Sequence, residues 1–213
     1  MTKIILSLET KESIDNFAYL GKYVDGIKIN HLLWNEVDFV VEDGKELFVD
    51  FKLWDTPNTV KTVVESIIKK GGTMTTISTF NNESVFDELE QYKDDIKLLA
   101  VTYLTSWNRD EQYQICREMP DFMWRRHLSR VKGFYGVVCS AQDIGMLSGA
   151  DKSLKRVCPG ITYGNNNSGQ VRTTTPKEAQ DLGADYIVIG RAITESENPL
   201  ETLKQIRNSP ITQ

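Results

Sequence analysis

Short apolar runs rich in β-branched residues alternate with amphipathic segments along the 213-residue chain. Eight of these runs predict strands, at residues 3–9, 24–30, 47–52, 73–78, 96–102, 134–139, 154–158 and 185–190. Between the third and fourth runs, residues 56–70 carry Val60, Val64 and Ile67 at helical spacing. Another helix is expected over residues 176–182. Eight strands alternating with about as many helices predict an α/β protein, a (β/α)8 TIM barrel.

A doubly wound open sheet is the structural alternative. A dinucleotide-binding fold of that kind places a Gly-x-Gly-x-x-Gly stretch after its first strand, and none follows residues 3–9. No repeat, linker or low-complexity stretch breaks the pattern, so we expect residues 1–213 to form a single domain. The least regular part is residues 107–132, where residues 111–115 have a helical pattern and Pro120 interrupts it.

The charge and the cysteine and histidine counts exclude several classes of function. A formal net charge of -5 argues against a generic nucleic-acid or membrane surface, and no apolar run approaches the ~20 residues of a membrane span. Three widely spaced cysteines, Cys116, Cys139 and Cys158, fit neither a disulfide framework nor a paired-cysteine zinc site. Only two histidines occur, His31 and His127, so we expect no histidine-rich metal site. The expected setting is a reducing cytoplasm.

The most informative stretch is residues 50–59, Asp-Phe-Lys-Leu-Trp-Asp-Thr-Pro-Asn-Thr, at the end of the third predicted strand. Strand side chains alternate between faces, so Asp50 and Lys52 are expected to point the same way and Phe51 the other. Asp55 adds a third charge three residues on. Ordinary surface charges explain this stretch equally well when it is taken alone, because most Asp and Lys residues are exposed.

The predicted barrel makes a functional role for these charged residues more plausible. Active sites of such barrels lie at the carboxyl ends of the strands, which brings residues distant in sequence together. The polar and charged residues that fall there are Glu9, Lys28, Asp50, Lys52, Asp55, Ser106 and Arg191. One such residue is unremarkable, but the whole set at one rim favours an active site.

Two segments near the end of the chain predict a phosphate site. Residues 159–170 form a long polar loop after the seventh predicted strand, and Gly190-Arg191 follows the eighth. Barrels often bind phosphate between these two loops, at the N-terminus of a short helix. Gly190 allows close backbone approach, and the Arg191 guanidinium can hold two phosphate oxygens.

Residues 50–60 resemble the Asp-x-Lys-x-x-Asp-x-Pro-Asn-Thr-Val signature of the orotidine 5'-phosphate decarboxylase family. Stretches along nearly the full chain resemble the same family, in the same order and at matching separations: residues 26–28, 101–106, 136–142, 159–161 and 185–191. Order and separation together are far more specific than a single motif.

The resemblance implies a dimeric barrel that converts orotidine 5'-monophosphate to UMP, the last step of de novo pyrimidine nucleotide biosynthesis, with no metal or organic cofactor. It implies a catalytic network of Lys28, Asp50, Lys52 and Asp55, in which Lys52 donates a proton to C6 of the pyrimidine. Asp55 and Thr59 would complete the site of the partner subunit. The residues implied in substrate binding are Glu9, Lys28, Thr59, Thr105, Ser106, Pro159, Gln170, Gly190 and Arg191.

The chain departs from the family pattern at three places. Glu9 stands where the family usually has an aspartate that is thought to reach a ribose hydroxyl. Lys28 is followed by Ile29-Asn30 rather than a small glycine, and Thr162 stands where many bacterial members carry arginine. We therefore expect the phosphate contact from position 162 to be lost.

Two rival functions remain open. The first is a magnesium-dependent decarboxylase or aldolase of the same barrel group, acting on a sugar phosphate. Such relatives tend to carry a metal-binding glutamate on the second strand, where this chain has Lys28. The second is a catalytically silent phosphate-binding module, which would need only the phosphate end and not all four network charges.

Overall fold

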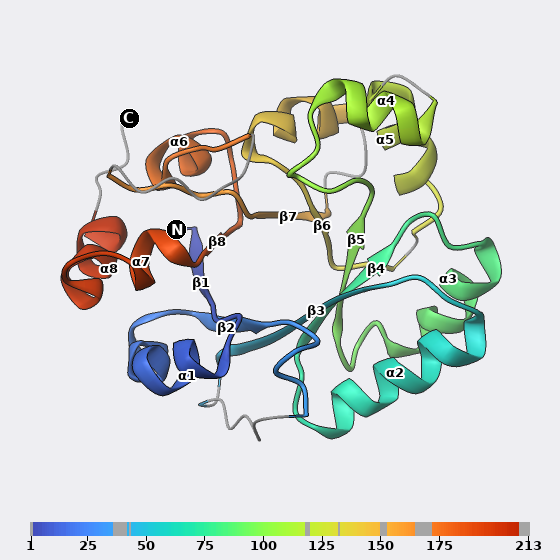
Figure 1. The fold of residues 1–213 in the computed structure, drawn as a ribbon. Helices are drawn as coiled ribbons and strands as arrows, with labels where there is room; N and C mark the ends of the chain where they lie inside the picture. The colour runs from blue at the N-terminus through green and yellow to red at the C-terminus, as the bar shows by residue number, and fades with distance from the viewer. Residues whose placement is uncertain are drawn as a thin grey trace.

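Eight parallel strands close into a barrel in the order of the chain, with β8 paired to β1 (Figure 1). The structure, a computed structural model, describes residues 2–35, 42, 44–117, 120–131, 133–149, 153–164 and 172–208. The strands are β1 Lys3–Ser7, β2 Gly26–Ile29, β3 Glu46–Leu53, β4 Met74–Ser78, β5 Lys97–Val101, β6 Gly136–Val138, β7 Lys155–Cys158 and β8 Tyr186–Ile189. The predicted (β/α)8 fold is confirmed, and every predicted strand exists.

Helices surround the barrel on its outside (Figure 1). The α-helices are α1 Lys11–Phe17, α2 Pro57–Lys69, α3 Glu83–Leu89, α4 Arg109–Cys116, α5 Pro120–Leu128, α6 Pro176–Asp181, α7 Arg191–Thr194 and α8 Pro199–Asn208. In the described part of the chain, 3-10 helices occur as η1 Ala18–Tyr23 after α1, η2 Glu90–Tyr92 after α3 and η3 Ala141–Gly149 between β6 and β7. Both predicted helices are confirmed, as α2 and α6. In residues 107–132, the helix α4 ends before Pro120, and Pro120 begins a second helix, α5. The fixed φ of proline suits the first position of a helix.

Side chains of a strand alternate between faces, so strands such as β3 contribute to two separate cores. Inside the barrel, Phe48 of β3 packs in one cluster with Ile5, Met74, Leu99 and Val188. Leu47 and Val49 of the same strand belong to the larger outer cluster, against which the helices pack. The amphipathic α2 buries Val60, Val64 and Ile67 there, at about 1.5–3 kcal/mol for each fully buried aliphatic side chain.

A polar cluster closes the amino-terminal end of the barrel. The Glu46 carboxylate forms an ion pair with Lys97 and accepts a hydrogen bond from the Thr73 hydroxyl at 2.8 Å. Beside it the Tyr135 and Tyr186 hydroxyls lie 2.7 Å apart. Burial raises the pKa of Tyr186, and the hydrogen bond to Tyr135 adds to this effect. Every polar group of this cluster has a partner within the protein, which is typical of a stabilising barrel end.

Among the described residues, no helix has both the length and the apolar composition needed to cross a membrane.

Candidate active site

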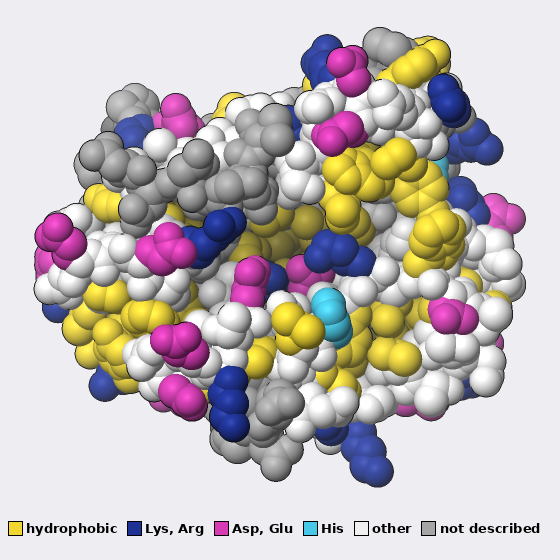
Figure 2. Space-filling view, in the orientation of Figure 1, with side chains coloured by type: hydrophobic (Ala, Val, Ile, Leu, Met, Phe, Trp, Pro, Cys, Tyr) yellow, Lys and Arg dark blue, Asp and Glu magenta, His cyan; other side chains and the backbone are white. Residues whose placement is uncertain are grey.

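A cavity of about 550 Å³ opens at the carboxyl-terminal end of the barrel. Figure 2 looks into this hollow, where lysine, arginine and acidic side chains stand around an apolar floor. The floor consists of barrel-interior residues, Val101, Val138, Val157 and Val188. An apolar floor excludes water from one side of the cavity, so charges on its walls interact more strongly than they would in bulk water.

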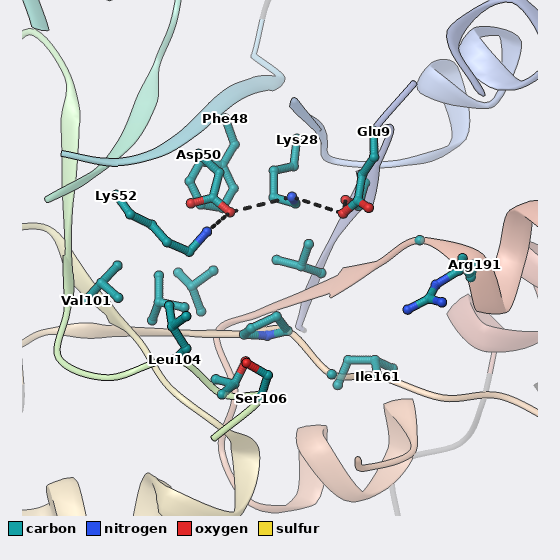
Figure 3. Close-up of a pocket in the computed structure, with 18 of the residues that line it drawn as sticks. Glu9, Lys28, Phe48, Asp50, Lys52, Val101, Leu104, Ser106, Ile161 and Arg191 are labelled. Carbon is teal, nitrogen blue, oxygen red and sulfur yellow. Dashed lines mark hydrogen bonds and ion pairs between the residues drawn. The ribbon is translucent and has the colours of Figure 1, made fainter. Parts of the chain in front are cut away.

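Four alternating charges form a chain along one wall of the cavity (Figure 3). Lys28 Nζ lies 3.6 Å from Glu9 Oε1 and 3.5 Å from Asp50 Oδ2. Lys52 Nζ donates a hydrogen bond to the same Asp50 oxygen at 2.8 Å. The predicted shared face of Asp50 and Lys52 is therefore confirmed. Lys28, which was expected in the same network, also pairs with Asp50, and Glu9, which was expected at the same rim, extends the chain of charges.

Strand β3 presents Asp50 and Lys52 through an irregularity that the sequence pattern did not predict. The register of β3 against β4 shifts between Val49 and Leu53. Lys52 lies within this irregularity and has a φ of 52°, a left-handed conformation that is uncommon for residues other than glycine. Phe51 between the two charged residues packs outward, with its ring centroid 5.5 Å from that of Trp34.

Asp50 is held in its charged form by its neighbours. Burial by itself raises the pKa of this carboxyl group. The positive charges of Lys52 and Lys28, with hydrogen bonds from Lys52 and the Thr76 hydroxyl, outweigh burial, so the pKa lies below its ordinary value. Asp50 is therefore a carboxylate at neutral pH, and it fixes the Lys52 ammonium at the cavity wall.

The segments after β5 and β7 form the opposite wall. Thr105 and Ser106 line the cavity after β5, and Pro159 lines it after β7. Ser106 is drawn near Leu104 in Figure 3, across the cavity from the charged chain. This wall supplies hydroxyl groups rather than charges, which suits recognition of a polar ring.

Gly190 and Arg191 line the third side, where β8 passes into α7. A Cβ atom at Gly190 would lie 3.3 Å from the Cβ of Ser7, so the close approach of β8 to β1 favours glycine. The Arg191 guanidinium points into the cavity from the side away from Lys52 (Figure 3). A positive group at this end suits an anionic part of a ligand.

Three predicted site residues are not seen in this cavity. Asp55 and Thr59 are exposed, and within the described part of the chain they do not line the cavity. The Asp55 carboxylate instead accepts a hydrogen bond from the Thr56 N–H at 2.6 Å, and the Thr59 hydroxyl lies 3.0 Å from that of Thr56. Gln170 lies outside the described residues.

Comparison with known proteins gives a consistent result. A profile of the "Orotidine 5'-phosphate decarboxylase / HUMPS family" matches residues 3–206. A curated orotidine 5'-phosphate decarboxylase of Staphylococcus aureus (strain Newman) is 32% identical over 222 residues, covering 97% of this chain and 96% of the relative. The chain belongs to this family. It is therefore an enzyme of the orotidine 5'-phosphate decarboxylase group.

Solved structures of similar fold agree with this membership. The orotidine 5'-phosphate decarboxylase of Lactobacillus acidophilus matches with a TM-score of 0.72 and 25% identity, covering 97% of this chain and 98% of that one. The enzyme of Pyrococcus horikoshii OT3 matches with a TM-score of 0.74 and 24% identity, covering 95% and 96%, and this likeness concerns the fold alone.

Two residues on and after β4 were not identified from the sequence, although they contact residues 50–55. The Thr76 hydroxyl bonds Asp50 and the Lys52 backbone. The Asn81 side chain donates to the Leu53 carbonyl at 2.9 Å and accepts from the Asp55 N–H at 3.2 Å. Thr76 could have been identified from one signal, because it is a polar residue in a strand, β4, that is buried throughout.

Proposed function

We propose that this family member removes CO2 from orotidine 5'-monophosphate to give UMP, the last step of de novo pyrimidine nucleotide biosynthesis. One observation carries the proposal: the Lys52 ammonium, bonded to Asp50, stands at the wall of a cavity with an apolar floor, and Arg191 lies at the far side. A phosphate bound at Arg191 would leave the pyrimidine of the same nucleotide between Lys52 and the Thr105–Ser106 wall.

The chemistry needs a cation at the place where negative charge develops. When the bond between C6 and the carboxylate breaks, its electron pair stays on C6, and no adjacent group accepts it. The Lys52 ammonium faces this charge before the reaction begins, which stabilises the transition state more than the bound substrate. Lys52 then transfers a proton from Nζ to C6, giving UMP and leaving a neutral amine that regains its proton from solvent.

Asp50 has two roles in this proposal. It orients Lys52, and its negative charge lies near the position of the substrate carboxylate, which disfavours the bound substrate until CO2 departs. Enzymes lower barriers by about 8–23 kcal/mol, and a decarboxylation without an electron sink needs the upper part of that range. Binding energy from the remote phosphate supplies a further contribution.

The remaining residues are assigned to substrate binding. Arg191, Gly190 and Gln170 hold the 5'-phosphate, and Thr105, Ser106 and Pro159 face the pyrimidine. Glu9 and Lys28, which are paired at 3.6 Å, contact the ribose hydroxyls. Glu9 has one methylene more than the aspartate usual in the family.

We also propose a homodimer in which Asp55 and Thr59 complete the partner's site. Both residues are exposed, and in the described part of the chain neither lines the cavity. Trp54 beside them exposes 71% of its surface, which is unusual for a large apolar side chain. Mixing Lys52→Ala with Asp55→Ala subunits tests this. Hybrid dimers would contain one intact site, so activity should return, whereas no recovery after subunit exchange would contradict a shared site.

The sugar-phosphate rival is less well supported because Lys28 occupies the place of the metal-binding glutamate, with two carboxylates beside its ammonium. The deciding experiment follows the absorbance change of orotidine 5'-monophosphate with purified protein in excess EDTA. Full activity is expected. Inactivation by EDTA that magnesium reverses would support the rival, and ligand binding without turnover would support a silent binding module.

A further inference from the structure

Strand β4 pairs with β3 alongside Asp50 and Lys52, and the register between the two strands shifts there. Val49 pairs with Thr75 and Leu53 pairs with Ile77, so β3 advances four residues while β4 advances two. Asp50, Phe51 and Lys52 therefore occupy a bulge, where the regular ladder of backbone hydrogen bonds is interrupted. A buried backbone N–H in such a bulge needs another acceptor.

The side chain of Thr76 meets this need. Its hydroxyl oxygen accepts the Lys52 N–H at 2.8 Å and donates its own hydrogen to Asp50 Oδ1 at 2.9 Å. A hydroxyl can donate and accept at the same time, so the two bonds are compatible. Thr76 is completely buried, and it points to the barrel interior, since its neighbours Thr75 and Ile77 pair and pack on the outer side.

We propose that Thr76 is a positioning residue for catalysis, whose single hydroxyl fixes both the left-handed backbone of Lys52 and the carboxylate of Asp50. This inference rests on the proposed function for its kinetic consequence. Thr76 is not among the described residues that line the cavity. It therefore acts on the substrate only through the Asp50–Lys52 pair.

The geometry explains why both bonds matter. A residue other than glycine at positive φ is held there only when its surroundings favour that conformation, and the Lys52 N–H bond to Thr76 is such a restraint. The second bond occupies Asp50 Oδ1, which leaves Oδ2 for the two lysines. Without the hydroxyl, the carboxylate can rotate and Lys52 loses its fixed direction.

The charged groups around Asp50 are Lys28 on β2 and Lys52 on β3, with Glu9 on the far side of Lys28. From β4, Asp50 accepts a hydrogen bond from the Thr76 hydroxyl. Since this hydroxyl is a donor to the charged form, its removal is expected to raise the pKa of Asp50.

Thr75 offers a matched control on the adjacent position. It is also completely buried, and its hydroxyl donates to the Val49 carbonyl at 2.9 Å on the outer face of the sheet. Thr75→Val and Thr76→Val thus remove the same hydroxyl from neighbouring buried positions, but only Thr76→Val removes a contact to Asp50 and Lys52. Thr76→Ser keeps the hydroxyl and should rescue the defect.

The test combines steady-state decarboxylation of orotidine 5'-monophosphate with carbon NMR titration of Asp50, assigned by comparison with Asp50→Asn. Thr76→Val is expected to lower kcat about 10- to 100-fold, as for a lost hydrogen bond to a charged group, with KM within about threefold of the parent. Its Asp50 pKa should rise. Thr75→Val and Thr76→Ser should keep both kcat and the Asp50 pKa near parent values.

Parent-like kcat in Thr76→Val, or equal losses in Thr75→Val and Thr76→Val, would overturn the proposal. Thermal unfolding and a second hydroxyl-free variant, Thr76→Ala, check the fold; loss of folding in both would make the hydroxyl structural and also overturn it. If the parent itself leaves the nucleotide unchanged, the proposed function fails. The NMR titration then still decides whether Thr76 holds Asp50, because it needs no reaction.

Discussion

The two ends of the barrel each place a carboxylate against a lysine, yet the two clusters differ in what the lysine faces. At the amino-terminal end, Glu46 is 4% exposed and pairs with Lys97, whose ammonium lies 5.3 Å from the centre of the Tyr135 ring. At the carboxyl-terminal end, Asp50 pairs with Lys52, whose side chain is 43% exposed and borders the cavity. Both clusters contain equal numbers of opposite charges, so net charge does not distinguish them.

The difference lies in the partners that remain available. Lys97 has a carboxylate and an aromatic face within the protein, whereas Lys52 has a carboxylate on one side and the cavity on the other. The Lys97 side chain is 34% exposed, so exposure alone does not separate it from Lys52. A cation whose ammonium has its partners within the protein contributes to folding, while a cation that borders a cavity can also stabilise charge on a ligand. The comparison predicts that equivalent mutations at the two ends separate activity from stability.

The largest effect is expected from Lys52→Met. Loss of the proposed proton donor and of its positive charge should reduce kcat by about 10⁴-fold or more, since general acid catalysis contributes about 10²–10⁴-fold and electrostatic stabilisation a comparable factor. The midpoint of thermal unfolding should change little, because Lys28 still pairs with the Asp50 carboxylate in this variant. Steady-state kinetics and thermal unfolding measure the two effects. Activity within tenfold of the parent would contradict the role of Lys52.

A smaller loss of activity is expected from Arg191→Ala at the phosphate end of the cavity. Removing the guanidinium should lower kcat/KM for the nucleotide by about 10- to 100-fold, the range for a hydrogen bond to a charged group. The nucleoside without phosphate should react equally with parent and variant. Arg207→Ala is the control, because Arg207 pairs with Asp25 away from the cavity. Equal losses on nucleotide and nucleoside would place the phosphate elsewhere.

The mirror experiment at the other end is Lys97→Met. It leaves the Glu46 carboxylate buried without its cation and should lower the free energy of unfolding by about 1–3 kcal/mol, as measured by urea unfolding. Decarboxylation at a temperature where the variant is folded should match the parent. Lost activity in the folded variant would show that the two ends are coupled, which the comparison excludes.

The same comparison shows how far the sequence predicts this molecule. Alternation of strand side chains placed Asp50 and Lys52 on one face correctly, because that inference needs only the local period of two. The bulge at Lys52 was not predictable, because its restraint comes from Thr76 on the neighbouring strand. The Glu46–Lys97 pair was missed for a similar reason, since it joins the first residues of β3 and β5, which lie on either side of β4.

The predicted end of the first strand was wrong, again because the local sequence pattern does not determine it. The first strand was expected over residues 3–9 but ends at Ser7, although the Leu8 N–H still bonds to the Lys28 carbonyl. The apolar pattern continues past the point where the strand ends. Asp55 was expected with the other rim charges, but Asn81 holds its backbone and the carboxylate turns to Thr56. Its role in a partner's site stays a prediction, as does the single domain over residues 1–213.

The smallest effect is expected in the dependence of stability on pH at the carboxyl-terminal cluster. The pKa of Asp50 is lowered in the folded protein, so its ion pairs contribute stability above the unfolded value of about 3.9. This contribution should disappear as the pH falls through the lower folded value. The unfolding free energy of Asp50→Asn should therefore lie below that of the parent at pH 7, and the gap should narrow only below about pH 4. Asp181→Asn, which breaks the exposed pair with Lys177, should show a gap of about 0–1 kcal/mol at pH 7. If the stability gap of Asp50→Asn instead widened on acidification, Asp50 would not be held as a carboxylate. Lys52 would then lack the fixed negative partner that distinguishes the carboxyl-terminal cluster as a site for a ligand.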